Sequence, residues 1–195
     1  SSVSTSQSAS AASAAGVTKI GDVEIPTQEE ALAKLGLDKV PESVLCATYN
    51  TTIMAYNLGL DITGTVTTTR PMPDALKDTP TIGVVTGRSD FDFEKIFALA
   101  GDVVIADSQY EPKLRPTLEQ QGIASCYVDT ADFGKLKEAL ATLGCALGKR
   151  DQVIDILNSW KNKYNRTATM PFLEAEACYE GIAKVPKNLT RKMAY

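Results

Sequence analysis

The chain of 195 residues contains no histidine. Histidine is the commonest protein ligand of zinc, copper and non-haem iron, and it is also the commonest general base in enzymes. Without it a serine hydrolase triad cannot form, and the sequence also has no G-x-S-x-G elbow and no G-x-x-x-x-G-K-S/T phosphate loop. We therefore expect no catalytic residues, no protein-held metal and no resident cofactor, and we expect a protein that is not an enzyme.

Other absences narrow the class of partner. The net charge is −4, and lysine and arginine form no cluster, so nucleic acid is not an expected partner. No apolar run approaches the roughly 20 residues that span a bilayer. The sequence also shows no secretory hydrophobic segment, so we expect a signal peptide to be absent or already removed.

The few cysteines do not have the spacing of a metal-binding site. The four cysteines, Cys46, Cys126, Cys145 and Cys178, include no C-x-x-C pair. Cys46 and Cys126 lie inside apolar, strand-like runs, and we expect them to be small buried hydrophobic residues. Spacing alone leaves open a disulfide that involves Cys145 or Cys178.

The clearest pattern of secondary structure in the sequence lies in residues Thr81 to Tyr110. Two short β-branched runs, 82–85 and 103–106, predict buried strands, and Asp92 between them predicts the cap of a helix. The side chains expected to face inward from this helix are Phe93, Ile96, Phe97 and Leu99, and those expected to face outward are Glu94 and Lys95. Such a strand–helix–strand unit is typical of a parallel sheet, with ligands bound beyond the carboxyl ends of the strands.

The same alternation extends along most of the chain. Strands are predicted at 43–48, 61–68, 81–85, 102–106 and 123–128, with helices at 53–60, 92–99, 111–122 and 133–147. Residues 49–52 are expected to form a polar loop, and 69–78 an irregular crossover with two prolines. The predicted fold class is α/β, a Rossmann-like, mostly parallel five-stranded sheet with helices on both faces.

The two ends of the chain differ from this core. Residues 1–16 are rich in serine and alanine and predict a disordered tether, or else a non-native leader. Residues 17–149 are expected to form the α/β lobe, beginning with a hairpin at 17–26 and a capping box at 27–30 whose helix ends at Gly36. Asp151 is expected to cap a long helix over 150–166, and 167–195 predicts a helical or irregular tail, with an amphipathic pattern in 171–184 but no second set of strands.

Loops that follow parallel strands open at one edge of the sheet, and here they carry polar and aromatic side chains. The candidate ligand-binding residues in these loops are Tyr49, Asn50, Arg70, Arg88 and Tyr110. Guanidinium, phenol and amide groups together suit a polar, oxygen-rich and anionic ligand. For each residue taken singly, an ordinary solvated loop is the competing interpretation.

The segment from Phe91 to Ala106, FDFEKIFALAGDVVIA, resembles the N-lobe signature of the iron-complex and cobalamin class (class III) of ABC-transporter solute-binding proteins. A capped helix with a leading glutamate is followed there by an "ALxPDLVI" strand entry, and residues 98–105 keep most of it, with glycine in place of proline. The similarity covers roughly Val17 to Arg166, and residues 150–166 resemble the helix that links the two lobes of the family.

This resemblance implies capture of an iron–siderophore, haem or cobalamin outside the cytoplasm and delivery to an ABC permease. Glu94 matches the glutamate that docks on the permease, and Arg70, Arg88 and Tyr110 lie where family members contact ligand. The resemblance also implies a lipid anchor upstream of the tether, and thus a membrane-anchored lipoprotein at the cell surface or in the periplasm. A siderophore, which supplies its own iron ligands, suits a chain without histidine better than haem does.

The family has two lobes, whereas this chain predicts one. An alternative is therefore an isolated lobe that acts as a non-transporting interaction module. Another is a cytosolic flavodoxin-like or sugar-isomerase-like enzyme that uses the same loops. The serine-rich segment and the missing general base favour the binding protein over the enzyme.

Overall fold

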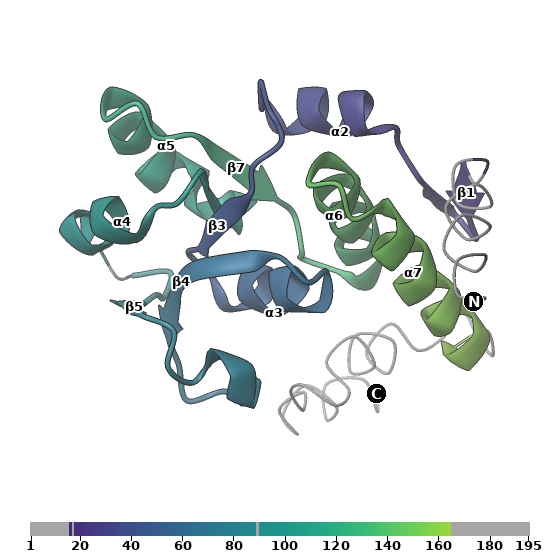
Figure 1. The fold of residues 1–195 in the computed structure, drawn as a ribbon. Helices are drawn as coiled ribbons and strands as arrows, with labels where there is room; N and C mark the ends of the chain where they lie inside the picture. The colour runs from purple at the N-terminus through teal and green to yellow at the C-terminus, as the bar shows by residue number, and fades with distance from the viewer. Residues whose placement is uncertain (1–15, 17, 89, 165–195) are drawn as a thin grey trace, which may run out of the picture.

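The computed structural model describes residues 16, 18–88 and 90–164, with side chains up to residue 161. Its centre is a five-stranded sheet in the order β5-β4-β3-β6-β7 (Figure 1), and every neighbouring pair is parallel. The strands are β3 (Ser43–Cys46), β4 (Asp61–Thr67), β5 (Thr81–Val84), β6 (Val103–Asp107) and β7 (Ser125–Val128). The predicted parallel α/β fold is confirmed.

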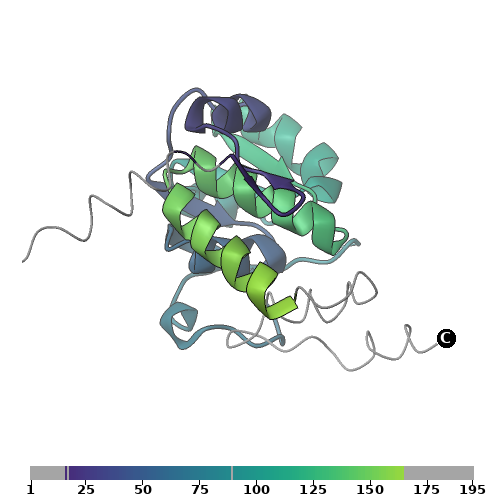
Figure 2. The same ribbon diagram turned by 90° about the vertical axis from the view of Figure 1, so that its right-hand side faces the viewer.

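Helices cover both faces of this sheet. They are α2 (Gln28–Leu35), α3 (Tyr49–Asn57), α4 (Phe93–Leu99), α5 (Glu111–Gln120), α6 (Phe133–Ala146) and α7 (Arg150–Tyr164), with short 3-10 turns η1 (Asp74–Leu76) and η2 (Ser108–Tyr110). Figure 2 shows α7 lying against α6 on the outside of the molecule. The chain runs from β3 outward to β5 and then returns to β6 and β7, so α3 and α6 lie on one face and α4 and α5 on the other.

Alternation along the central strands divides the core into two clusters. In β6, Val103 and Ile105 pack towards α3, α6 and α7, while Val104 and Ala106 pack towards α4 and α5. All of β6 is buried, so its first four residues, 103–106, are all apolar and not alternately polar, and the strand ends in the buried Asp107. This arrangement leaves the carboxyl ends of the strands, where the loops begin, as the edge available to a ligand.

The N-terminal elements follow local sequence signals. A two-stranded hairpin, β1 (Lys19–Ile20) with β2 (Val23–Glu24), is antiparallel as predicted. The capping box is present, because the Thr27 hydroxyl accepts from the Glu30 amide and the Glu30 carboxylate accepts from the Thr27 amide. Helix α2 ends at Gly36 in a left-handed conformation, with φ of 68°, which a residue without a side chain adopts without strain.

Three local predictions are wrong. Residues 49–52 are not a loop, because Thr48 is already extended at the cap position and α3 begins at Tyr49. Asp151 does not cap α7, because the amide of Val153 bonds to the carbonyl of Lys149 and the helix begins at Arg150. Phe97 does not face inward: its side chain is 36% exposed on the flank of the short helix α4, while Ile96 takes the buried position.

The predicted tether over 1–16, the end of the long helix at Arg166 and the tail over 167–195 fall almost wholly outside the described residues. The domain boundaries therefore stay predictions. None of the helices within 18–88 and 90–164 combines the length and apolar character needed to cross a membrane.

Helix α6 packs closely against α7 at Gly144. A Cβ atom at this position would lie 2.1 Å from a methyl carbon of Val153 and 2.9 Å from one of Leu58. We expect Gly144→Ala to lower the free energy of unfolding by about 1–3 kcal/mol, although alanine favours helix, because overpacking outweighs propensity. Urea unfolding followed by circular dichroism measures the change.

Gly134→Ala is the matched control on the same helix. Its Cβ would meet only a carboxylate oxygen of Asp132, at 3.3 Å. The control should change stability by less than about 1 kcal/mol. Equal effects from the two substitutions would contradict close packing at Gly144.

Candidate functional site

The first residue of α3 meets the loop after β4 through a stacked pair. The guanidinium carbon of Arg70 lies 3.7 Å from the centre of the Tyr49 ring, and the Tyr49 hydroxyl donates to the Pro71 carbonyl at 2.7 Å. Burial raises the pKa of Tyr49, and the Arg70 charge opposes that shift. The neutral phenol ring therefore attracts the guanidinium and helps to hold Arg70 at this edge.

A second polar contact joins the first turn of α3, the end of β6 and the loop after β7. The Asn50 side-chain amide donates to the Thr130 hydroxyl at 2.9 Å, and the Thr130 hydroxyl donates to the carboxylate of Asp107. Thr48 and Asn50 also hydrogen-bond to Asp107, whose side chain is largely buried at the end of β6. Burial raises the pKa of Asp107, and these hydrogen bonds partly offset the shift.

An aromatic contact lies on the α4–α5 side of the edge. Tyr110, in η2, is buried and meets Phe91 edge to face, with 5.6 Å between ring centres. Burial raises the pKa of Tyr110, and the charge of Asp107 raises it further. Tyr110 is therefore a neutral, rigid phenol next to the Asp107 contacts.

Two candidates lie outside this group. Arg88 follows the edge strand β5, and its side chain is exposed. Glu94 is exposed in the first turn of α4, next to the capping residue Asp92, whose carboxylate accepts from the Lys95 amide. The structure thus brings Tyr49 and Arg70 into contact. It also joins Asn50 to the end of β6, because Asn50 hydrogen-bonds to Asp107.

Sequence reasoning did not single out Asp107 or Phe91. Asp107 directly follows the apolar run 103–106, and a carboxylate at the end of a buried central strand was the signal that could have found it. Phe91 had no such signal, because its contact with Tyr110 joins the loop before α4 to η2 and depends on how β5 and β6 are placed.

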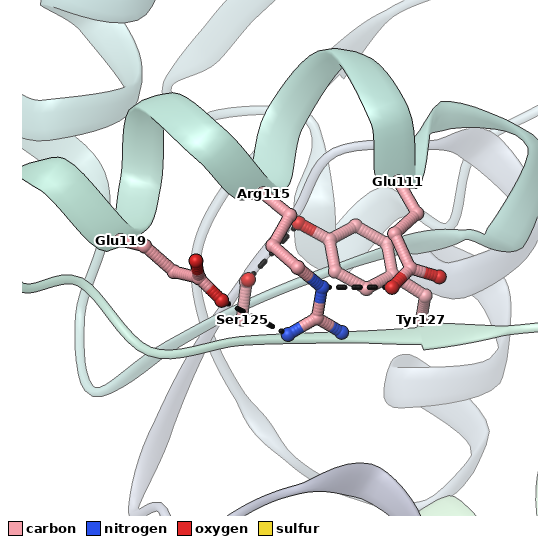
Figure 3. Close-up of polar contacts among 5 residues, drawn as sticks. All are labelled: Glu111, Arg115, Glu119, Ser125 and Tyr127. Carbon is pink, nitrogen blue, oxygen red and sulfur yellow. Dashed lines mark hydrogen bonds and ion pairs between the residues drawn. The ribbon is translucent and has the colours of Figure 1, made fainter.

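Arg115, in α5, shows an arginine that is already engaged by the protein (Figure 3). Its guanidinium binds the carboxylates of Glu111 at 2.7 Å and Glu119 at 3.4 Å, and it lies 4.9 Å from the Tyr127 ring centre. The Tyr127 hydroxyl in turn donates to Ser125 at 2.9 Å on the edge strand β7. The carboxylates of α5 itself therefore hold Arg115 in place.

The described cysteines are free and buried, as predicted for Cys46 and Cys126. Burial raises the pKa of Cys126 to about 12 and raises that of Cys46 further, so both are neutral thiols in the core. Cys145 is also buried without a disulfide, and Cys178 lies outside the described residues. Within those residues, no three histidine, cysteine or acidic side chains are grouped to hold a metal ion.

A family profile described as "Periplasmic binding protein" matches residues 44–169. The chain belongs to the periplasmic binding protein family. The family resemblance predicted from residues 91–106 is thereby confirmed. A comparison with curated proteins gave no match.

Solved structures of this family share the fold. SirA from Staphylococcus aureus, complexed with staphyloferrin B, is 25% identical with a TM-score of 0.53, over 74% of this chain and 48% of that one. The Fe3+–Desferal-bound siderophore binding protein FhuD from Vibrio cholerae is 17% identical, with a TM-score of 0.54 over 64% and 48%. An ABC transporter substrate-binding protein from Listeria monocytogenes EGD-e is 19% identical, with a TM-score of 0.54 over 64% and 48%. The chain spans about half the length of these relatives.

We expect Asp107→Asn to gain stability relative to the unaltered chain as the pH rises from 4 to 7. Because burial raises the pKa of Asp107, its contribution to stability is complete below its ordinary pKa and is lost as the pH rises through the folded-state pKa. The amide does not titrate, so the difference in unfolding free energy should widen with pH. Urea unfolding at a series of pH values measures it.

Asp129→Asn should behave in the opposite way. The Ala131 amide donates to the exposed Asp129 carboxylate, and this bond lowers the pKa of Asp129. The unaltered chain then gains stability as the pH rises through the ordinary pKa, so this variant should lose relative stability. A pH dependence of the same sign in both variants would contradict the burial of Asp107.

Proposed function

We propose that this lobe binds a ferric siderophore or a related iron complex outside the cytoplasm and presents it to an ABC permease. The observation that carries the proposal is Arg70, supported on the Tyr49 ring at the ligand edge of a periplasmic-binding-protein lobe. The similar SirA and FhuD structures contain staphyloferrin B and Fe3+–Desferal. The protein is a carrier and not an enzyme.

The loop edge suits the outer surface of a ferric chelate. Arg70 and Arg88 offer charge-assisted hydrogen bonds to anionic oxygens, and Asn50, held by Thr130, completes the polar lining. Tyr49 and Tyr110 are buried neutral aromatic groups that back this edge, Tyr49 against Arg70 and Tyr110 against Phe91. A siderophore supplies the iron ligands itself, so the protein needs no histidine; haem and cobalamin are the alternative ligands for the same edge.

In the proposed arrangement, this lobe contacts only one side of the ligand. Because the chain spans about half the length of its relatives, a second lobe would cover the opposite face of the ligand. One lobe buries less of the ligand surface, so its affinity is lower than that of an enclosing pair. Delivery would use the exposed Glu94 as a docking residue for permease arginines, and a lipid anchor upstream of the tether would hold the protein at the membrane.

Calorimetric titration with ferric desferrioxamine, ferric staphyloferrin B, haemin and cyanocobalamin tests the ligand class. We expect a binding heat with an anionic ferric chelate, and we expect Arg70→Ala to weaken it by about 10- to 100-fold, because a charge-assisted hydrogen bond is lost. Arg115→Ala should leave the affinity unchanged, since Arg115 is bound to Glu111 and Glu119. No heat and no thermal shift with any of these compounds would refute the ligand assignment.

Glu94→Ala should weaken association with the permease while leaving siderophore binding unchanged. Glu94 is exposed, so its removal disturbs no core contact. Glu29→Ala is the matched control, because Glu29 is also an exposed glutamate in the first turn of a helix. Pull-down of the permease in detergent measures association, and equal retention of the two variants would count against docking through Glu94.

A further inference from the structure

The two edges of the five-stranded sheet differ in regularity. Strand β5, at one edge, has a shift in its register against β4, and Gly83 within it has a φ of 103°. Strand β7, at the other edge, pairs with β6 from Ser125 to Val128 without a shift. An irregular edge resists pairing with another strand, whereas a regular edge does not. The β7 edge is therefore the one that a further strand can join.

The main chain of β7 presents hydrogen-bonding groups at this edge. The Val104 amide donates to the Ala124 carbonyl at 2.9 Å, so residues 124, 126 and 128 direct their main-chain groups at β6. The amides and carbonyls of Ser125 and Tyr127 consequently point to the outer side of the sheet. Outside the ladder with β6, no hydrogen bond between described residues involves the main chain of Tyr127.

A polar cleft lies along the same edge. It has a volume of about 640 Å³, and it is lined by residues 127–129, by α6, by the β1–β2 hairpin and by the end of α2. This volume falls within the roughly 300–1,000 Å³ of ligand sites in proteins. Because the hairpin and α2 also line the cleft, a second sheet with its covering helices would collide with them. A single extended chain is narrow enough to enter.

Side chains of both charges line the cleft: Lys19, Lys34, Lys135, Glu24, Asp129 and Glu138. Lys135 already pairs with Asp129 at 3.2 Å. A ligand of one sign would meet like charges as well as opposite ones, so the cleft does not suit a simple anion or cation. The main chain of a peptide is neutral and offers both donors and acceptors. The mixed charges therefore match an extended peptide with polar side chains of both signs.

The other face of β7 carries an aromatic side chain (Figure 3). Tyr127 faces the α4–α5 side of the sheet, whereas Val128 faces the α6 side. The half-buried Tyr127 ring lies 4.9 Å from the guanidinium carbon of Arg115, and its hydroxyl donates to Ser125 at 2.9 Å. These contacts hold the ring along the strand edge. A β-branched side chain on an added strand would pack against its exposed part.

We propose that the β7 edge binds an extended segment of a partner protein, which joins the sheet as a sixth strand. Polar side chains of the segment lie among the charges of the cleft, and alternate β-branched side chains pack on Tyr127. Main-chain bonds to residues 125 and 127 supply affinity, and the alternating side chains supply selectivity. Tyr49, Arg70 and Arg88 do not line this cleft, so it is separate from the proposed siderophore contacts.

A terminally blocked peptide, acetyl-Thr-Val-Lys-Val-Glu-Val-amide, tests the proposal on the full chain. We expect it to shift the amide NMR signals of residues 125–129 and to slow hydrogen exchange of the Tyr127 amide about tenfold. The signals of residues 81–84, on the irregular edge strand, should stay unchanged.

N-methylation of alternate peptide residues is the matched control on the peptide. Successive amides of an extended chain point to opposite sides, so one alternate set faces β7 and the other faces away. One N-methylated peptide should therefore bind at least about tenfold more weakly, and the other should bind as the unmodified peptide does.

Tyr127→Pro tests the protein side of the same contact. The Tyr127 amide is not part of the ladder with β6, so proline removes an outward donor without removing a bond of the sheet. Tyr127→Ala is the matched control, because it deletes the same side chain and keeps the amide. Proline should weaken peptide binding at least about tenfold, and alanine by at most about fivefold. If proline prevents folding, the two N-methylated peptides decide the question on the unaltered chain.

Two results would overturn the proposal. In the first, the two N-methylated peptides bind equally, or no signal of β7 shifts with the unmodified peptide. In the second, the β7 signals and the elution volume of the unaltered chain change with protein concentration when no peptide is present. A second copy of this chain would then pair with the edge in place of a partner segment.

Discussion

The loop edge depends on a carboxylate buried at the end of β6. Asp107 is 8% exposed, and a charge in such a position is tolerated only when donors surround it. Thr130, Thr48 and Asn50 supply those donors from the neighbouring loops. The need to satisfy one buried charge therefore fixes several loops relative to each other, and it orders the edge before any ligand arrives.

The buried Asp107 has opposite effects on the stability of the chain and on the order of this edge. Burying Asp107 lowers the stability of the folded chain at neutral pH, yet the same residue positions Asn50 and Thr130. The Arg70–Tyr49 contact adds a second link, between the loop after β4 and the start of α3. An edge that is ordered in advance would lose less conformational entropy on binding the proposed ligand.

The two faces of the sheet differ in what they carry. The α4–α5 face carries Tyr110 against Phe91, and Glu94 is exposed on α4; these are the residues of the proposed ligand contact and the proposed permease docking. The opposite face is built around Gly144, where α6 approaches α7 closely. Helix α7 thus completes the core with Val153 and Leu157, while Ile156 and Trp160 pack against it only partly buried.

The sequence by itself determined the strands, most helices and the parallel class, because strands buried on both faces must be apolar throughout and caps such as Thr27 act locally. It also located Tyr49, Asn50, Arg70 and Tyr110, since loops after parallel strands share one edge. Only the tertiary structure decided which of them meet: the Arg70–Tyr49 contact joins the loop after β4 to the start of α3, and Asp107 gathers donors up to 59 positions away. The exposure of Phe97 and the early start of α3 were likewise decided by packing, because sequence periodicity shows that a helix has an apolar side but not how much of it the neighbouring elements cover.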